Sequence, residues 1–500
     1  MADLGDIVGD MTDVDQRPRE RPPNEKTFFG QPRVLANLFG VELWERFSFY
    51  GMQGILLLYL YFPTDQGGLG ISQDTAVGVV GAYGGLVYLS TIAGGWVADR
   101  LIGSERTLFY AAVLVMAGHI ALSVLPGTLG VGVGLVLIAI GSGGVKANAT
   151  SLVGTLYSEE DPRRDAGFSI FYLGINLGAL LGPLLTGWLQ TSYGFHIGFA
   201  AAAVGMAIGL IQYTIGRRQL SEAANEVPDP LPNQKRLWYA LGIAAGAVII
   251  PVLAVTGVLR ATNLDQAVII VILASTLAYF IVILTSRHVT AVERKRVIAF
   301  IPMFIASAAF WSLYQQQFTV LTVYSDYQLN RDIFGWTMPI SWVQSINPVF
   351  IIILSGVFAA IWTKLGDRQP PTPLKFAAGT VVMGIAFLMF IPMASTQPNS
   401  APLLGLIGVI FVFTIAELLL SPVGLSLATK LAPEAFKTQM VALFFLSVAL
   451  GTALSGTLAQ YYSTDTQVPY FGILGGVAIV IGIALALMTP WLERLMGRVR

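Results

Sequence analysis

The sequence contains no cysteine, which excludes disulfide bonds, thiolate metal sites and cysteine nucleophiles. Histidine is scarce too, with only His119, His196 and His288. No Walker loop, HExxH or GxSxG pattern occurs, so nothing supports ATP drive, a zinc protease or a serine hydrolase. We therefore expect neither a metal ion nor a cofactor, and we do not expect an enzyme.

Charge is also scarce, because only 12% of the residues are charged while 55% are hydrophobic. Soluble domains carry about 25% charged residues. Apolar runs of about 20 residues, the length that crosses a bilayer core of about 30 Å, recur along the chain, for example in residues 108–125, 240–259, 267–284 and 468–488. A backbone in lipid must satisfy its own hydrogen bonds, so these runs predict an all-α membrane protein surrounded by lipid. The 29 basic and 29 acidic residues balance, which gives no indication of a nucleic-acid partner.

The apolar runs predict about fourteen membrane-spanning helices in two groups of six with an inserted pair between them. A polar stretch, Gly216–Arg236, separates the first six from the pair, and Arg287–Arg296 closes the pair. The predicted division is a tail at 1–30, a six-helix bundle at 31–218, a linker and two inserted helices at 219–293, a second six-helix bundle at 294–496, and a C-terminus at 497–500.

Lysine and arginine predict the orientation, because basic loops stay in the cytoplasm. If the N-terminus is cytoplasmic, about 25 of the 29 basic residues fall in the tails and cytoplasmic loops. Only Arg260 and Arg331 fall outside, and Arg46 and Lys146 fall within spans. We expect a multi-pass protein of the cell membrane with both termini in the cytoplasm.

A repeated loop pattern indicates that the two halves are related. Gly95–Arg106 contains Asp99 and Arg100, and Trp362–Arg368 is a weaker copy. The first copy resembles the loop signature of the major facilitator superfamily. The Asp–Arg pair favours a structural clamp between helix ends, and a part in gating is compatible with it. Parallel repeats of this kind place a substrate site between the halves, near the midplane of the membrane.

Five ionisable residues fall inside predicted spans, where charge is costly and usually faces a cavity or a partner: Glu42, Glu45, Arg46, Lys146 and Glu417. A purely structural ion-pair network is the alternative. The set carries one net negative charge when fully ionised, so one proton neutralises it. Because burial favours the neutral carboxyl form, we hypothesise that one of the glutamates carries a coupling proton.

Four separated motifs resemble those of the proton-dependent oligopeptide transporters, a family within the major facilitator superfamily. They are Glu42-x-x-Glu45-Arg46-Phe47 with Tyr50-Gly51, Lys146, Phe171-Tyr172-x-x-Ile175-Asn176-x-Gly178, and Glu417 before Ser421-Pro422. The resemblance covers residue 28 to the C-terminus, and the inserted pair is similar to that of bacterial members. Gly178-x-x-x-Gly182 is also a small-residue helix-packing motif.

The resemblance implies proton-coupled symport of di- and tripeptides by alternating access, with a monomer as the functional unit. Arg46 and Lys146 would attract the peptide carboxylate, and Glu417 would receive its ammonium group. The other implied substrate-binding residues are Tyr50, Tyr88, Asn176, Trp311, Gln315, Asn347, Ser421 and Phe444. Proton coupling would fall to Glu42, Glu45 and Glu417, and gating to Lys146, Glu417, Gln53, Gln315, Asp99 and Arg100.

The chain departs from the family at Gln53, where arginine is common, and at Gln315, where an acidic residue is common. Two neutral side chains leave no buried unpaired charge, and a Gln53–Gln315 hydrogen bond would keep the contact. Phe49 also replaces a usual tyrosine. The departures leave open a relative that carries another small zwitterionic solute. A passive channel and a membrane-embedded enzyme are further alternatives, although no nucleophile–base or metal cluster supports the enzyme.

Overall fold

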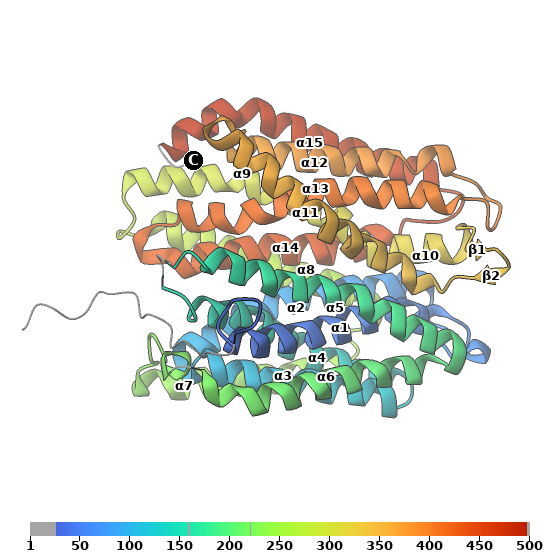
Figure 1. Cartoon of the computed structure of the whole chain (residues 1–500), viewed down its shortest axis with the longest axis horizontal. Helices are drawn as coiled ribbons and strands as arrows, with labels where there is room; N and C mark the ends of the chain where they lie inside the picture. The colour runs from blue at the N-terminus through green and yellow to red at the C-terminus, as the bar shows by residue number, and fades with distance from the viewer. Residues whose placement is uncertain (1–26, 159–160, 221, 498–500) are drawn as a thin grey trace, which may run out of the picture.

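The computed structural model describes residues 27–158, 161–220 and 222–497, and the chain is almost entirely helical (Figure 1). Most of the predicted tail at 1–30 and nearly all of the C-terminus at 497–500 lie outside these residues. The helices are α1 Val34–Tyr61, α2 Gln73–Val97, α3 Ser104–Val124, α4 Gly127–Gly154, α5 Arg164–Tyr193, α6 Phe195–Gly216, α7 Asn233–Val255, α8 Leu264–Thr285, α9 Ala291–Tyr314, α10 Val320–Tyr327, α11 Ile346–Leu365, α12 Thr372–Leu388, α13 Leu403–Leu431, α14 Lys437–Ala459 and α15 Gln467–Met496. Two short strands, β1 Asp332–Ile333 and β2 Trp336–Thr337, form an antiparallel hairpin.

Thirteen helical segments in the described part of the chain are long and apolar enough to cross a membrane. One of them, Ala291–Tyr327, joins α9 to α10 through a 3₁₀ turn, Gln315–Phe318. The 28-residue α1 is not among the thirteen, because Glu42, Glu45 and Arg46 lower its hydropathy. With α1 added, the described part of the chain has fourteen candidate spans, the number predicted from the sequence.

The helices form two halves that lie against each other in Figure 1, with α1–α6 in the lower layer and α9–α15 in the upper layer. Within the first half, α1 packs against α5 and α6, and α3 packs against α4. Within the second half, α12 packs against α13 and α15, and α9 packs against α14. The halves meet chiefly where α2 packs against α14 and where α5 packs against α11.

The Gly178-x-x-x-Gly182 motif lies where α5 and α1 approach most closely. A Cβ atom at Gly178 would lie only 2.4 Å from the carbonyl oxygen of Leu43, and one at Gly182 only 2.4 Å from that of Phe47. Side chains at these positions would push the helices apart, so the predicted packing role is confirmed.

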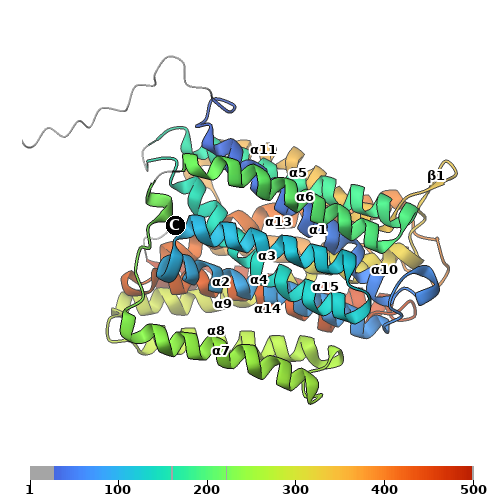
Figure 2. The same ribbon diagram turned by 90° about the horizontal axis from the view of Figure 1, so that it is seen from below.

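The inserted pair, α7 and α8, lies along one side of the molecule (Figure 2). Helix α8 packs against α2 of the first half and against α14 and α9 of the second. Helix α7 is farther out, and none of its residues, all of which are described, is buried. An apolar helix of this kind suits a lipid environment.

The two ends of the bundle differ in charge. We call the end with the connecting segments 98–103, 155–158, 161–163, 217–220, 222–232, 286–290, 366–371 and 432–436 the positive end, because most of the described lysines and arginines lie in or next to these segments. The opposite end, with the loops at 62–72, 256–263, 328–339, 394–402 and 460–466, is the far end.

Hydrogen bonds join the two halves at the far end. Trp342 Nε1 donates to the carbonyl oxygen of Leu184 at 2.9 Å, and Ser345 Oγ donates to that of Leu180 at 2.8 Å. The Tyr61 hydroxyl in α1 donates to Asp326 Oδ2 in α10 at 2.5 Å. These contacts hold the halves together at the far end.

Candidate functional site

A buried group of charges lies on one face of α1. Arg46 Nε is 2.7 Å from Glu42 Oε1 and 3.3 Å from Glu45 Oε2, and all three residues are at most 5% exposed. The Ser142 hydroxyl of α4 donates to Glu45 Oε1. Two carboxylates thus surround one guanidinium, and the group carries one net negative charge. Within the described residues, Glu42 Oε2 and Glu45 Oε2 accept no hydrogen bond.

Lys146 of α4 has aromatic rings as its close partners. Its Nζ atom lies 4.5 Å from the ring centroid of Tyr88 and 4.9 Å from that of Phe49. Cation–π contacts of this length stabilise a desolvated ammonium group without neutralising its charge. Lys146 and Glu417 do not form an ion pair with each other in this conformation, so the positive charge is available to an anionic ligand.

Glu417 of α13 is the corresponding negative charge in the second half. Its Oε2 atom accepts hydrogen bonds from the Tyr314 hydroxyl at 2.9 Å and from Asn347 Nδ2 at 3.2 Å. Asn347 Nδ2 also donates to Thr414 Oγ1 at 3.1 Å. Donors from α9 and α11 therefore fix the orientation of the carboxylate. The second oxygen, Oε1, makes no hydrogen bond to another described residue.

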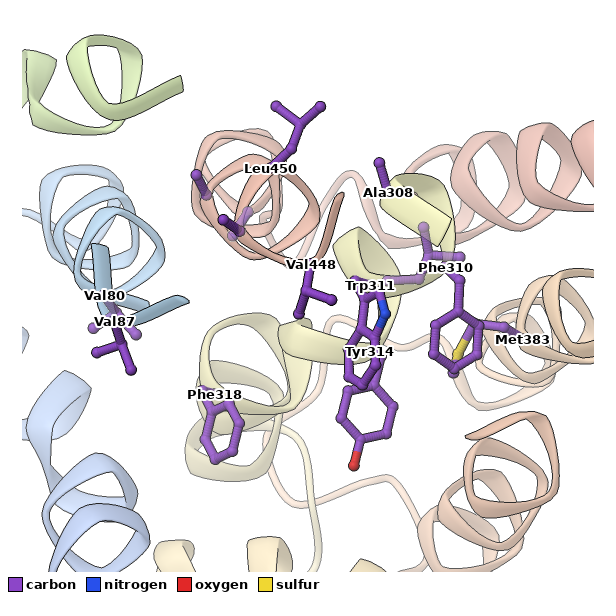
Figure 3. Packing of buried hydrophobic residues seen from close by; sticks show 14 of the residues in the cluster. Val80, Val87, Ala308, Phe310, Trp311, Tyr314, Phe318, Met383, Val448 and Leu450 are labelled. Atoms are coloured by element: carbon purple, nitrogen blue, oxygen red, sulfur yellow. The ribbon is translucent and has the colours of Figure 1, made fainter. Parts of the chain in front are cut away.

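A cavity of about 80 Å³ lies between the two halves, large enough for several water molecules. The first half contributes Phe49, Tyr50, Gln53, Gly84 and Tyr88, and the second contributes Trp311, Tyr314, Gln315, Gln317, Phe318, Glu417 and Thr452. Figure 3 shows Trp311, Tyr314 and Phe318 along the segment where α9 changes to the 3₁₀ turn, with Val80 and Val87 of α2 opposite them. The rings of Tyr50 and Phe318 stack across the halves at 6.1 Å.

Five of the eleven residues predicted to bind substrate line this cavity. Its lining includes Tyr50, Tyr88, Trp311, Gln315 and Glu417, together with the predicted gating residue Gln53. Lys146 does not line the cavity, but its ammonium group lies against the rings of Phe49 and Tyr88, which do. Asn347 donates a hydrogen bond to the lining residue Glu417, and Arg46 lies one helical turn before the lining residue Tyr50 on α1.

Six of the eleven predicted substrate-binding residues do not line the cavity in this conformation: Arg46, Lys146 and Asn347, described above, and Asn176, Phe444 and Ser421. The Asn176 carboxamide donates to the carbonyl oxygen of Tyr172 within α5, at 2.9 Å. Phe444 packs against Gly424, where a Cβ atom would lie 2.3 Å from its ring. Ser421 lies one helical turn beyond Glu417 on α13.

The first loop motif makes a different contact from the clamp that the sequence suggested. Arg100 Nη1 lies 2.7 Å from Asp229 Oδ2, so its ionic partner is in the linker before α7 rather than at a neighbouring helix end. The linker also pairs through its backbone, because Asp229 N donates to Asp99 O and Leu231 N donates to Arg100 O, both at 3.0 Å. The side chain of Asp367, in the second copy, lies outside what the structure describes.

The expected hydrogen bond between Gln53 and Gln315 is not formed. Both side chains line the cavity, but Gln53 Oε1 has no hydrogen-bond partner within the described residues. Both carboxamides line the cavity, so each presents polar atoms to a ligand.

Sequence reasoning missed several residues of the site, above all Tyr314. It lies three residues after Trp311, so both are on one helical face, and their rings pack edge to face at 5.1 Å. That spacing was visible in the sequence. Phe318, Gln317 and Thr452 gave no comparable signal, because their places depend on the 3₁₀ turn and on the packing of α14.

This architecture, with two helical halves around a cavity that has the anion Glu417 in its lining and the cation Lys146 behind its aromatic wall, defines a multi-pass membrane transporter. A protein-family model described as the POT family matches residues 105–475. The di-/tripeptide transporter of Lactococcus lactis subsp. cremoris is 40% identical over 95% of this chain and 99% of its own length.

Solved structures agree with the sequence comparison. A crystal structure of a peptide transporter POT in complex with sulfate has a TM-score of 0.91 and 44% identity, and covers 94% of this chain and 97% of its own. A POT family transporter crystallised with 5-aminolevulinic acid has a TM-score of 0.87 and 39% identity, over 94% and 98%. The chain belongs to the POT family, with the major facilitator fold predicted from the sequence, and it is a transporter rather than an enzyme.

Proposed function

We propose that the chain is a proton-coupled symporter that brings di- and tripeptides into the cell by alternating access. One observation carries this proposal: the cations Arg46 and Lys146 belong to one half, Glu417 belongs to the other, and one cavity lies between them. A short peptide is a zwitterion, so it needs opposite charges on opposite sides of its site. A relative at 40% identity is named a di-/tripeptide transporter, which supports this substrate class.

The charges have different parts in this proposal. Arg46 already forms salt bridges with two carboxylates, whereas Lys146 forms no salt bridge with a described residue, so Lys146 is the first contact of the peptide carboxylate. Glu417 Oε1 has no hydrogen bond to a described residue and receives the peptide ammonium group.

The polar and aromatic walls complete the proposed site. Tyr50, Tyr88 and Gln315 hydrogen-bond the peptide backbone, and Trp311 forms a wall for peptide side chains. Asn176, Ser421 and Phe444 join the site when the halves separate and the cavity widens.

The coupling proton is proposed to bind among Glu42, Glu45 and Glu417. Among the described residues, Glu42 Oε2 is buried without a hydrogen bond, and Glu45 Oε2 has only its 3.3 Å ion-pair contact with Arg46. A buried oxygen without a hydrogen bond is costly for a carboxylate and less so for a carboxylic acid. Glu417 changes partners when the peptide ammonium binds or leaves. If pH-driven uptake survives the simultaneous change of all three to glutamine, this assignment is wrong.

We further propose that the protein lies in the cell membrane as a monomer in contact with lipid, with the positive end and both termini in the cytoplasm. The asymmetry of basic loops supports this orientation. Because the native chain has no cysteine, single cysteines at the exposed positions Gln66 and Arg106 report each end separately. A membrane-impermeant thiol reagent added to intact cells is expected to label Gln66→Cys at the far end and not Arg106→Cys.

The direct test is uptake of labelled dialanine into liposomes that contain the purified protein, with an inward proton gradient and a negative interior. Uphill accumulation that a protonophore abolishes is the expected result, and a passive channel would show none. Glu417→Gln is expected to remove accumulation. Glu493→Gln, the same change at an exposed position on α15, is expected to leave it intact. Absence of accumulation by the folded wild-type protein overturns peptide–proton symport, and counterflow then separates a wrong substrate from lost coupling.

A second candidate is the transport of another small zwitterion, such as an amino-acid derivative. A structural neighbour at 39% identity was crystallised with 5-aminolevulinic acid, and the neutral pair Gln53 and Gln315 departs from the family pattern. Competition decides between the candidates. If 5-aminolevulinic acid accumulates and dialanine neither accumulates nor competes, the second candidate replaces the first.

A further inference from the structure

Asp265 of the inserted helix α8 is a buried carboxylate outside the candidate site. It is 1% exposed, and its Oδ2 atom accepts hydrogen bonds from Thr457 Oγ1 at 2.6 Å and from Gln460 Nε2 at 2.9 Å. Its other oxygen, Oδ1, has no hydrogen-bond partner among the described residues. Asp265 lies in the first turn of α8, and a buried carboxylate oxygen without a hydrogen bond is costly, so packing alone does not account for it.

The buried face of α8 follows the line where α2 and α14 meet. Asp265, Val268, Ile272, Thr276 and Phe280 recur every three or four residues and form one buried stripe. Helix α8 packs against both α2 and α14, and therefore covers this junction between the halves from the side. The second junction, between α5 and α11, has no inserted helix over it (Figure 2).

The contacts of α8 with the two halves differ in kind. On the second half, Asp265 accepts hydrogen bonds from Thr457 of α14 and from Gln460, which directly follows that helix, and the rings of Phe280 and Phe304 of α9 pack edge to face at 5.8 Å. On the first half, α8 meets the glycines of α2. These glycines also face the second half: a Cβ atom at Gly85 would lie 2.9 Å from Ala453 Cβ and 3.3 Å from Val268 Cγ1, and one at Gly78 would lie 2.7 Å from Gln460 Nε2 and 3.6 Å from Asp265 Cγ.

Helices α8 and α2 are both fully described, and no hydrogen bond or ion pair joins them. Because small residues of α2 face α8 and no hydrogen bond joins the two helices, α2 can slide along α8. In contrast, the hydrogen bonds of Asp265 must break before α8 can separate from α14. The carboxylate therefore fixes α8 to the second half only.

The linker before α7 makes the opposite connection. Asp229 bonds Arg100 at the end of the first half, and the ring of Tyr239 in α7 lies 5.1 Å from that of Trp96 in α2. Since α7 has no buried residue, it is free to move relative to α8. The inserted pair is thus connected to both halves: α8 is held by the second half, and α7, which is attached to the first half, is the more weakly packed of the two helices.

We propose that α8 is a lateral seal over the α2–α14 junction. Asp265 fixes α8 to the second half, so α8 moves with that half and α2 slides beneath α8 when the halves rock. The seal keeps lipid out of the cavity while the far end opens. Asp265 acts as a positioning residue in this process. The proposal rests on the alternating access proposed above.

Distances between spin labels on cysteine pairs test the proposal, because the chain has no native cysteine. Exposed positions at the positive end suit the labels: Thr285 on α8, Arg106 on the first half and Glu493 on the second. Between the peptide-free and dialanine-saturated protein, the 285–493 distance is expected to stay constant. The 285–106 distance is expected to change together with the 106–493 distance. A constant 285–106 distance with a changing 285–493 distance overturns the proposal.

Variants of Asp265 test the carboxylate itself. Asp265→Ala removes the acceptor and is expected to broaden the 285–493 distance distribution and to lower the maximal uptake rate severalfold without changing KM. Asp265→Asn keeps an acceptor oxygen and is expected to restore both readouts, which also controls for misfolding. An unchanged 285–493 distribution in Asp265→Ala, or a change in KM alone, contradicts the proposal.

The test remains decisive if dialanine is not the substrate. Tyr61→Phe, which removes a hydrogen bond between the halves at the far end, then replaces the peptide as the means of shifting the conformation. If dialanine is not taken up, while the 285–493 distance stays constant and the 285–106 distance changes, then the proposed substrate is wrong and the proposed seal is supported.

Discussion

At the scale of single residues, the site is organised by how each charge is satisfied. Arg46 is held by two carboxylates, Lys146 by two aromatic rings, and Glu417 by a tyrosine and an asparagine. The spans predicted from the sequence identified all three charges, because charge in a membrane helix is conspicuous. Their partners were harder to find, since Tyr314 is an ordinary residue for an apolar helix.

Tyr314→Phe is expected to raise the KM for dialanine about tenfold. The change removes one of the two donors that orient Glu417, and a hydrogen bond to a charged group contributes about 1.5–3 kcal/mol. Concentration-dependent uptake measures the effect. Tyr327→Phe, at an exposed tyrosine of the far end, is the control and should leave KM unchanged. An unaltered KM in Tyr314→Phe would show that Asn347 suffices to place the carboxylate.

Gln53→Arg and Gln315→Glu are each expected to destabilise the protein, and the double variant is expected to recover much of the loss. Gln53 is 4% and Gln315 7% exposed, so each single change adds a buried charge to the same cavity without the partner that the other change supplies. Breaking a buried pair typically costs about 3–5 kcal/mol. Thermal unfolding of the four proteins measures the coupling. Strictly additive losses would mean that the two positions are too far apart to pair.

At the scale of helices, the close approach of α5 to α1 holds the charge-bearing helix in place. Gly178 faces Leu43, Arg46 and Phe47, so the small residue and the buried charges form one contact. The sequence motif predicted the contact but not its partner helix, because a spacing of four residues defines a face and not what lies against it.

Gly178→Ala is expected to lower the thermal stability and to reduce dialanine binding. The added Cβ would lie 2.4 Å from backbone and 2.7 Å from Arg46 Cβ, and overpacking of this kind costs about 1–3 kcal/mol. Thermal unfolding and peptide binding are the measurements. Gly476→Ala on α15 is the matched control, since nothing lies within 4 Å of a Cβ there and the change should be neutral or slightly stabilising. Equal behaviour of the two variants would refute the packing argument.

At the scale of the whole molecule, this conformation is closed at the far end. The bonds of Trp342 and Ser345 to α5 and of Tyr61 to Asp326 must break before that end opens. Each bond adds to the free energy that holds the halves together, so alternating access is an equilibrium that single residues can shift.

Tyr61→Phe is expected to shift the population toward states open at the far end by about tenfold, the equivalent of a hydrogen bond of roughly 1.4 kcal/mol. Spin labels at the exposed Gln66 and Asp465, one on each half, report the opening as a longer distance. Tyr461→Phe, a 72% exposed tyrosine at the same end, is the control. Identical distributions in wild type and Tyr61→Phe would show that other contacts hold the far end.

The sequence by itself determined the membrane class, the number of spans, the inserted pair, the buried charges and the family resemblance. These depend on composition, on hydropathy and on motifs that are local in the chain. Tertiary structure decided which end is closed, that Arg100 pairs with Asp229, that Gln53 and Gln315 do not hydrogen-bond each other, and that Asp265 lies against α14. Each of these is a contact between helices far apart in sequence, and no pattern within one helix specifies which neighbour its buried face will meet.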